Sequence, residues 1–144
     1  MRKMETGLRH RLRRTVRQMA GQHEHLRTLH RALAQAVDRG RIAEIRESVE
    51  CLRGAIEAHF SLEDGVFFPA VRGFRPEVAR ELRTLVHEHG KYRADIARLS
   101  DALASGTLDA FAERCRALAE SIADHEEREE RLVATLADSF DANP

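Results

Sequence analysis

Glycine, proline and cysteine are scarce in this sequence, and the chain carries no net charge. Only 8 Gly and 3 Pro occur among 144 residues, so few positions interrupt a helix or favour a tight turn. Ala, Leu, Arg and Glu dominate instead, and these residues favour helices. The length is that of one ordinary domain with a single sizeable core. We therefore expect an all-α protein that forms one domain over residues 1–144.

The cysteines and the charges exclude further classes of protein. Cys51 and Cys115 are the only cysteines and form no CxxC pair, which argues against a disulfide framework or a thiolate metal site. Cys115 lies near an apolar stripe and is expected to be a small buried hydrophobic residue. Lys+Arg and Asp+Glu both number 24, and this balance argues against a nucleic-acid-binding module.

The sequence also lacks a long apolar run. Its first twenty residues are rich in Arg, but Leu8, Leu12, Val16 and Met19 recur among them at helical spacing. This spacing is typical of an amphipathic helix and differs from the continuous apolar segment of a signal peptide or membrane span. We expect a cytoplasmic protein with no membrane or nucleic-acid partner. The sequence leaves protein partners and oligomeric state open.

Helix-ending signals divide the chain into four amphipathic segments. Gly40, Gly73 and Gly106 mark three ends, and Thr107 is available as the N-cap of the last segment. The predicted helices span about 6–38, 42–71, 76–104 and 108–138. Pro69 should kink or terminate the second helix in its last turn. Short connections between long helices predict antiparallel neighbours, hence an up-down-up-down four-helix bundle.

A shift of 66 residues superposes one half of the chain on the other. The shift aligns three pairs of polar residues, namely His23 with His89, His59 with His125 and Glu63 with Glu129. It also aligns residues of the apolar stripes that recur at helical spacing in each segment, among them Val16 with Leu82, Met19 with Leu85, Leu52 with Leu118, Ile56 with Ile122 and Val66 with Leu132. We therefore expect two helical hairpins that carry the same polar residues at the same places.

The aligned polar residues fall within the apolar stripes of their helices. His59 and Glu63 are four residues apart, as are His125 and Glu129, so each pair points to one side of its helix. A buried carboxylate without a partner is costly, and the core stripes hold no Arg or Lys to compensate it. A cation bound by both carboxylates and the imidazoles would remove this cost. The pattern therefore predicts a metal site.

The ligand types narrow the choice of metal. Imidazole and carboxylate ligands without thiolate suit iron, manganese or zinc and disfavour calcium and magnesium. Helical bundles commonly hold two metals through carboxylates from opposing helices. Two non-haem irons bridged by the glutamates are the favoured interpretation, with a single iron, manganese or zinc as the alternative. The predicted ligands are His23, His59, Glu63, His89, His125 and Glu129.

These segments resemble a known family, the hemerythrin-like or HHE cation-binding domain. The resemblance rests on Gln22-His23-Glu24-His25-Leu26, His59-Phe60-Ser61-Leu62-Glu63-Asp64, Glu88-His89 and His125-Glu126-Glu127-Arg128-Glu129-Glu130. It covers essentially the whole chain and implies an oxo- or hydroxo-bridged di-iron centre that meets dioxygen. Members of the family carry oxygen, sense oxygen or iron, or handle peroxide or nitric oxide.

Other histidines compete for a place at the metal. His25 lies off the apolar stripe, whereas His23 keeps the 66-residue alignment with His89, so His23 is chosen as the ligand of the first helix. His25 and His87 should then face outward. His30 shares the face of His23 but lies too far along the helix axis for the same metal. It is expected to be a core histidine with a local partner, with a role in a proton path as the alternative.

The remaining polar residues near the motifs are given structural roles. Tyr92, the only tyrosine, should point inward with its hydroxyl bound to a partner. A supporting role at the metal is the alternative for Tyr92. No residue is assigned as catalytic, and Tyr92 and His30 are the two candidates for a supporting role. The solvated face is expected to hold Glu24, Glu88, Glu126, Glu127 and Glu130, with Glu130 a weak rival of Glu129.

One departure from the oxygen carriers of the family bears on function. Where the carriers have a further histidine one turn before His89, this chain has Leu85, and Met19 takes the equivalent place on the first helix. A metal with fewer nitrogen ligands keeps more positions open, which argues against a simple reversible carrier. We expect a protein that binds or reacts with dioxygen or a related molecule, in oxygen sensing or the response to oxidative stress. The alternatives are an enzyme that removes peroxide or nitric oxide and an iron-responsive interaction module.

Overall fold

The computed structural model describes the backbone of residues 2–141 and the side chains of residues 6–136. Within this part of the chain every regular element is helical, which confirms the all-α class. The long helices are α1 (Arg2–Arg39), α2 (Ile42–Leu62), α4 (Ala79–Ser105) and α5 (Leu108–Asp141). Shorter helical segments, η1 (Glu63–Phe67), α3 (Phe68–Phe74) and η2 (Pro76–Val78), connect α2 to α4.

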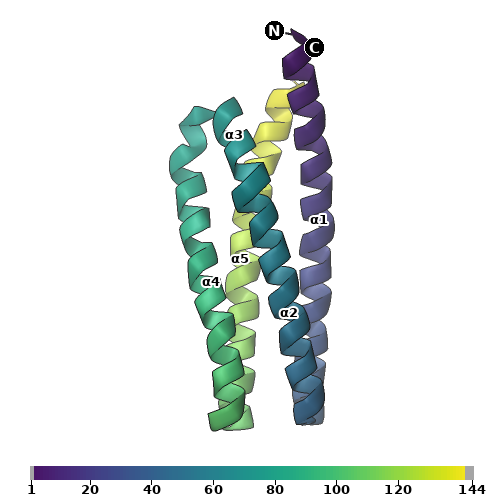
Figure 1. Cartoon of the computed structure of the whole chain (residues 1–144), viewed down its shortest axis with the longest axis vertical. Coiled ribbons are helices and arrows are strands. Elements are labelled where there is room, and N and C mark those ends of the chain that lie inside the picture. Colours follow the sequence, from purple (N-terminus) through teal and green to yellow (C-terminus); the bar gives the residue numbers. More distant parts are fainter. Residues whose placement is uncertain (1, 142–144) are drawn as a thin grey trace.

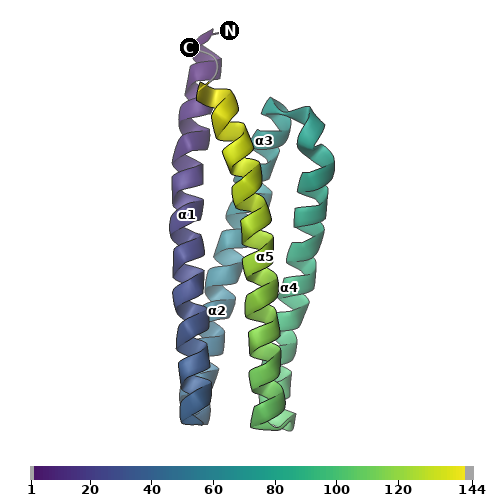
Figure 2. The same cartoon turned by 180° about the vertical axis from the view of Figure 1, so that it is seen from behind.

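The long helices form one bundle (Figure 1). α1 packs beside α2 and α5, and α4 packs beside α5 and α2. The start of α1 and the end of α5 lie at one end of the bundle, and the α1–α2 and α4–α5 connections lie at the other (Figures 1 and 2). No helix of the described backbone combines the length and the apolar character that a membrane crossing requires.

A glycine and a threonine set helix boundaries at the end with the tight connections. Gly40 has a positive φ of 68°, and its N–H donates to the carbonyls of Ala36 and Val37 at 3.1 and 3.0 Å. A left-handed glycine is a common way to end a helix, and it ends α1 here. Thr107 caps α5 as predicted, because its Oγ1 accepts a hydrogen bond from the N–H of Ala110 at 3.2 Å.

The helix that begins at Ile42 does not stop at Pro69. The N–H of Phe68 donates to the carbonyl of Glu63, five residues earlier, so η1 is a π-helical turn. Pro69 follows this turn at the start of α3. Proline is tolerated in the first turn of a helix, where its missing N–H is not needed. The chain therefore remains helical as far as Phe74. Pro69 does not terminate the helix, and the irregularity near it is one widened turn just before the proline.

The widened turn changes which side chains face the core. Val66, which the sequence places in the apolar stripe, is 53% exposed, whereas Phe67 and Phe68 are buried. A π turn contains more residues than an α turn, so side chains beyond it are rotated relative to regular α-helical spacing. The expectation for Val66 is therefore wrong.

The core consists of two apolar layers with a polar layer between them. One apolar layer contains Leu26, Leu33, Ile45, Leu99 and Phe111, among others, and the other contains Leu12, Met19, Phe68, Leu82 and Leu136. The buried polar residues between the layers include His23, His59, Glu63, His89, His125 and Glu129. In α1, for example, His23 stands between Met19 of one layer and Leu26 of the other. The apolar layers thus separate the polar layer from both ends of the bundle.

Gly40 and Gly54 provide a matched test of the helix ends. Gly40→Ala should destabilise the protein by about 1–2 kcal/mol, because a left-handed conformation costs an L residue roughly that much. Space is not limiting there, since an added Cβ would lie 3.8 Å from Leu108 Cδ2. Gly54→Ala, where an added Cβ meets nothing within 4 Å, should stabilise α2 by about 0.5–1 kcal/mol. Urea denaturation midpoints that move in the same direction would contradict this reading.

Candidate metal centre

Six side chains of the polar layer meet at the middle of the bundle. His23 comes from α1, His59 from α2, Glu63 from η1, His89 from α4, and His125 and Glu129 come from α5. Each is at most 2% exposed. The four-residue spacing brings His59 beside Glu63 and His125 beside Glu129. The structure therefore brings together all six residues that the sequence predicts as ligands.

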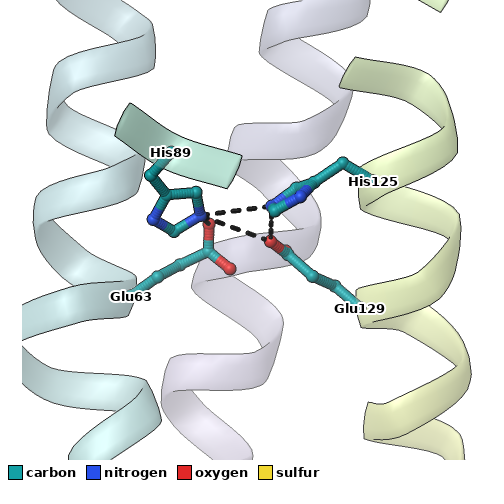
Figure 3. Close-up of side chains that lie close together, drawn as sticks. All are labelled: Glu63, His89, His125 and Glu129. Atoms are coloured by element: carbon teal, nitrogen blue, oxygen red, sulfur yellow. Dashed lines mark hydrogen bonds and ion pairs between the residues drawn. The ribbon is translucent and has the colours of Figure 1, made fainter. Parts of the chain in front are cut away.

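The six side chains form two groups that share one residue. In the first group, one potential ligand atom each from Glu63, His89, His125 and Glu129 all lie within 4.8 Å of one another. Figure 3 shows these four side chains pointing toward a common centre. The second group contains His23, His59 and the same Glu129, again within 4.8 Å. Glu129 thus lies between the two groups.

Glu63 also lies between the two groups. Its Oε1 is 2.9 Å from Nε2 of His59 and 3.4 Å from Nε2 of His89. Both glutamates are therefore within reach of histidines from both groups, which is the arrangement of carboxylates that bridge two metals.

Each of the four imidazoles is fixed through its Nδ1 atom. Oxygen acceptors lie 2.7 Å from Nδ1 of His59 and of His125, 2.8 Å from that of His89 and 3.3 Å from that of His23. The acceptor is Gln22 Oε1 for His59 and Glu88 Oε2 for His125. It is Asp64 Oδ1 for His89 and Glu130 Oε1 for His23. Because carboxylate and amide oxygens only accept, each Nδ1 carries the proton. The Nε2 atoms are then free to act as ligands, as in known metal-binding histidines.

The Nε2 atoms meet in two pairs. Nε2 of His23 is 3.0 Å from Nε2 of His59, and Nε2 of His89 is 3.1 Å from Nε2 of His125. Two adjacent nitrogen ligands about 2.1 Å from one metal lie about 3 Å apart. The paired imidazoles therefore have the spacing of ligands to a common ion.

The described residues compensate the two carboxylates only in part. Both oxygens of Glu63 and one of Glu129 are buried without a hydrogen-bond partner. Burial and the adjacent Glu129 raise the pKa of Glu63 strongly. Burial opposes ionisation of Glu129 too, but hydrogen bonds from His125, His23 and His89 outweigh it and lower the pKa of Glu129. The donor set and the orphaned oxygens both fit metal cations.

Protons take the place of positive charge when the metal is absent. Burial alone would lower the pKa values of His23 and His125, but hydrogen bonds to Glu129 outweigh it and raise both. His59 differs, because burial and the positive charge of His23 lower its pKa to about 3. A metal that binds Nε2 of His23 and His125 must displace these protons.

Glu88 has a role that the sequence analysis missed. It was assigned to the solvated face, but its side chain is only 19% exposed and binds Nδ1 of His125. Arg128 donates to both Glu88 oxygens, at 2.5 and 2.7 Å. Burial would raise the pKa of Glu88, yet the hydrogen bonds from Arg128 and His125 lower it to about 2. The 66-residue shift, which aligns Gln22 with Glu88 and Asp64 with Glu130, is the signal that could have identified these outer residues.

Glu126 is also misplaced by the sequence analysis. It is only 3% exposed, its Oε1 has no hydrogen-bond partner, and its Oε2 lies 3.7 Å from Nη1 of Arg27. Burial raises its pKa to about 7, although His23 and Arg27 act in the opposite direction. Glu130 is exposed but contacts His23, whereas Glu24 and Glu127 are exposed as expected.

The remaining candidates lie outside the cluster. His25 and His87 are exposed, in agreement with the choice of His23. Nε2 of His30 is buried without a hydrogen-bond partner among the described residues, which therefore do not provide the expected local partner. Burial lowers the pKa of His30 to about 4. Cys115 is buried as predicted. Tyr92 is buried, and its hydroxyl donates to the carbonyl of Ser121 at 3.0 Å.

These shifts predict how the metal-free protein responds to pH. His23 and His125 have raised pKa values in the fold, so the folded chain keeps protons that the unfolded chain releases above about pH 6.5. The raised pKa of Glu63 acts in the same direction. The lowered pKa values of His30 and His59 oppose this only below about pH 6.5.

Stability of the metal-free protein should therefore decrease as the pH rises from about 7 to 9. The urea midpoint, measured with a chelator present, should fall over this interval. The metal-loaded protein should show a smaller change, because bound metal replaces the protons. A midpoint of the metal-free protein that rises with pH would contradict the assignment of protons to this cluster.

Comparison with known proteins identifies the family. The family model described as the hemerythrin HHE cation binding domain matches residues 14–137. A search of curated proteins and a search of solved structures each gave no match. The matched segment includes all six clustered side chains and runs through all of the long helices. The chain therefore belongs to the hemerythrin HHE cation-binding domain family.

Proposed function

We propose that this protein holds two non-haem irons and binds or reacts with dioxygen or a related small molecule there. The observation that carries this proposal is the pairing of four Nε2 atoms whose Nδ1 atoms are all held by oxygen acceptors. His23 and His59 would bind one iron, and His89 and His125 would bind the other. Glu63 and Glu129 lie between the pairs and would bridge the irons.

The framework around the irons supports the same proposal. We infer an up-down-up-down bundle made of two hairpins of common design, in which each hairpin supplies two histidines and one glutamate. The 66-residue alignment of these ligands supports this inference, as does its extension to the Nδ1 partners. A centre shared by two hairpins would link metal binding to the packing of one hairpin on the other.

The surroundings of the histidines exclude water from one part of the site. The ring of Phe60 stacks on His89 with a centroid distance of 4.0 Å and an interplanar angle of 9°. Phe68 lies nearly parallel to the same imidazole, at 5.7 Å and 14°. Phe60 and Phe68 therefore hold the orientation of His89 and limit access of solvent to it.

The absence of further nitrogen ligands supports reaction over reversible carriage. Met19 and Leu85 are buried one turn before His23 and His89, respectively. The oxygen carriers of this family would have an additional histidine at the position of Leu85, in α4. Bound irons supply positions for a small molecule and the electrons to reduce it, and fewer protein ligands leave more positions open. A di-iron enzyme acting on peroxide or nitric oxide is the second candidate that this feature favours.

Metal analysis tests the number and identity of the ions. Protein expressed with added iron should contain between about one and two irons per chain. Glu129→Gln should lose most of this metal, because it removes the carboxylate common to both groups while keeping the side-chain volume. Glu127→Gln, on the exposed side of the same helix, is the control and should keep wild-type iron content. A site filled only with a single zinc after growth with added iron would contradict the di-iron proposal.

The visible spectrum tests the reaction. The reduced protein should oxidise in air within minutes without a persistent oxygenated species, because open positions favour irreversible oxidation. The oxidised protein should change its spectrum on addition of azide or peroxide. A stable oxygenated spectrum that reverses when oxygen is removed would instead support a carrier. If dioxygen, peroxide and nitric oxide all leave the spectrum unchanged, an iron-responsive interaction module becomes the better reading.

A further inference from the structure

The two halves of the polar layer differ in charge at one of the residues that accept a hydrogen bond from Nδ1 of a clustered histidine. The 66-residue shift aligns Gln22 with Glu88, so an amide in the first half corresponds to a carboxylate in the second. Each residue accepts a hydrogen bond at 2.7 Å from Nδ1 of a clustered histidine, His59 for Gln22 and His125 for Glu88. The hydrogen-bond length is therefore the same, whereas the charge of the acceptor differs.

The charge of the acceptor alters the histidine as a ligand. A hydrogen bond to a carboxylate is charge-assisted and stronger than one to an amide. It draws the Nδ1 proton toward the acceptor and makes Nε2 a stronger electron donor. Mutation of an outer hydrogen-bond partner of a metal ligand typically costs about ten- to a hundredfold in metal affinity, which sets an upper limit for this effect. Arg128 binds both oxygens of Glu88 and keeps the carboxylate in place. His125 is thus the stronger ligand of the two.

The packing around the histidines also differs between the two halves. His89 is stacked on Phe60 with a centroid distance of 4.0 Å, while the residue that the 66-residue shift aligns with Phe60 is Glu126. An aromatic ring thus holds a histidine of one half where the other half has a carboxylate.

We propose that the two metal positions differ in metal affinity. Glu88 acts as a positioning residue that gives the His89/His125 position the higher affinity. That position fills first, and the His23/His59 position fills second and exchanges its ion more readily. This inference rests on the proposed two-metal centre. It adds an order of filling and names the residue responsible.

One charge acts against this order. Glu126 is buried near His23 and would attract a cation to the weaker position. Its Oε2, however, lies 3.7 Å from Nη1 of Arg27, which offsets this attraction. The effect of Glu126 is separable from that of Glu88, because the two carboxylates act on histidines of different groups.

Cobalt(II) titration of the metal-free protein tests the proposal, since cobalt binding is visible by absorbance and by calorimetry. The wild type should bind in two resolved steps whose dissociation constants differ by up to about a hundredfold. Glu88→Gln should weaken the first binding step, and Gln22→Glu should tighten the second. Each variant should therefore reduce the ratio of the two dissociation constants. The double exchange should reverse the order of filling.

Further variants identify the positions. His89→Ala should abolish the tight step and His23→Ala the weak one, whereas in the double exchange these losses should be swapped. Glu127→Gln, an exposed carboxylate-to-amide change on α5, is the control and should leave the ratio at its wild-type value. Circular dichroism of each metal-free variant establishes that the fold is kept, so a change in ratio reports ligand strength and not unfolding.

The outcomes distinguish the inference from the proposed function. Two steps of equal affinity, or a ratio that neither Glu88→Gln nor Gln22→Glu changes, would overturn the inference and leave the two-metal centre intact. A ratio that responds only to Glu126→Gln would also overturn it, because Glu126 would then be the source of the asymmetry. Saturation at one cobalt per chain would overturn the two-metal centre itself.

Discussion

Two carboxylates buried where four helices meet are the constraint on which the rest of this structure depends. Glu63 and Glu129 lie in the middle of the bundle, and their free oxygens receive no hydrogen bond from the described residues. Isolated buried charges are too costly to keep, so bound protons or bound cations must supply positive charge at this place. The histidines beside the carboxylates can bind metal ions, and the same histidines bind protons when no metal is bound. The fold and its chemistry therefore share one electrostatic requirement.

The hydrogen bonds donated by the four Nδ1 atoms fix the orientation of the imidazoles around the carboxylates. A buried imidazole that is free to rotate would offer either nitrogen to a metal, but an oxygen acceptor at each Nδ1 leaves Nε2 facing inward. These acceptors lie nearer the surface than the ligands, so they reach solvent and surface arginines without exposing the centre. Arg128 on Glu88 and Arg93 on Asp64 are examples, with N–O distances of 2.5 and 3.6 Å. Residues near the surface thus fix the orientation of the buried histidines.

The inner residues could be predicted from sequence, whereas several outer ones could not. His59, Glu63, His125 and Glu129 stand within apolar stripes at a repeated spacing, and burial of polar groups there is unusual enough to indicate a site. Glu88 and Glu126 lie at the margins of their stripes, where helical periodicity alone does not separate a half-buried side chain from a solvated one. Whether such a residue turns inward depends on a partner from another helix, such as His125 or Arg27. The π turn was missed for a related reason, since Pro69 signals a break without specifying how the chain resolves it.

The π turn at Glu63–Phe67 also records how the two halves differ in length. Up to Glu63 and Asp64 the halves align with a shift of 66, but beyond the turn the buried Phe67 and Val71 correspond to the buried Leu132 and Leu136 with a shift of 65. The first half therefore contains one additional residue, and the widened turn absorbs it directly after a ligand. Any alignment of one half with the other needs a gap at this point. A deletion of one residue there would restore regular helical spacing, and with it a uniform repeat.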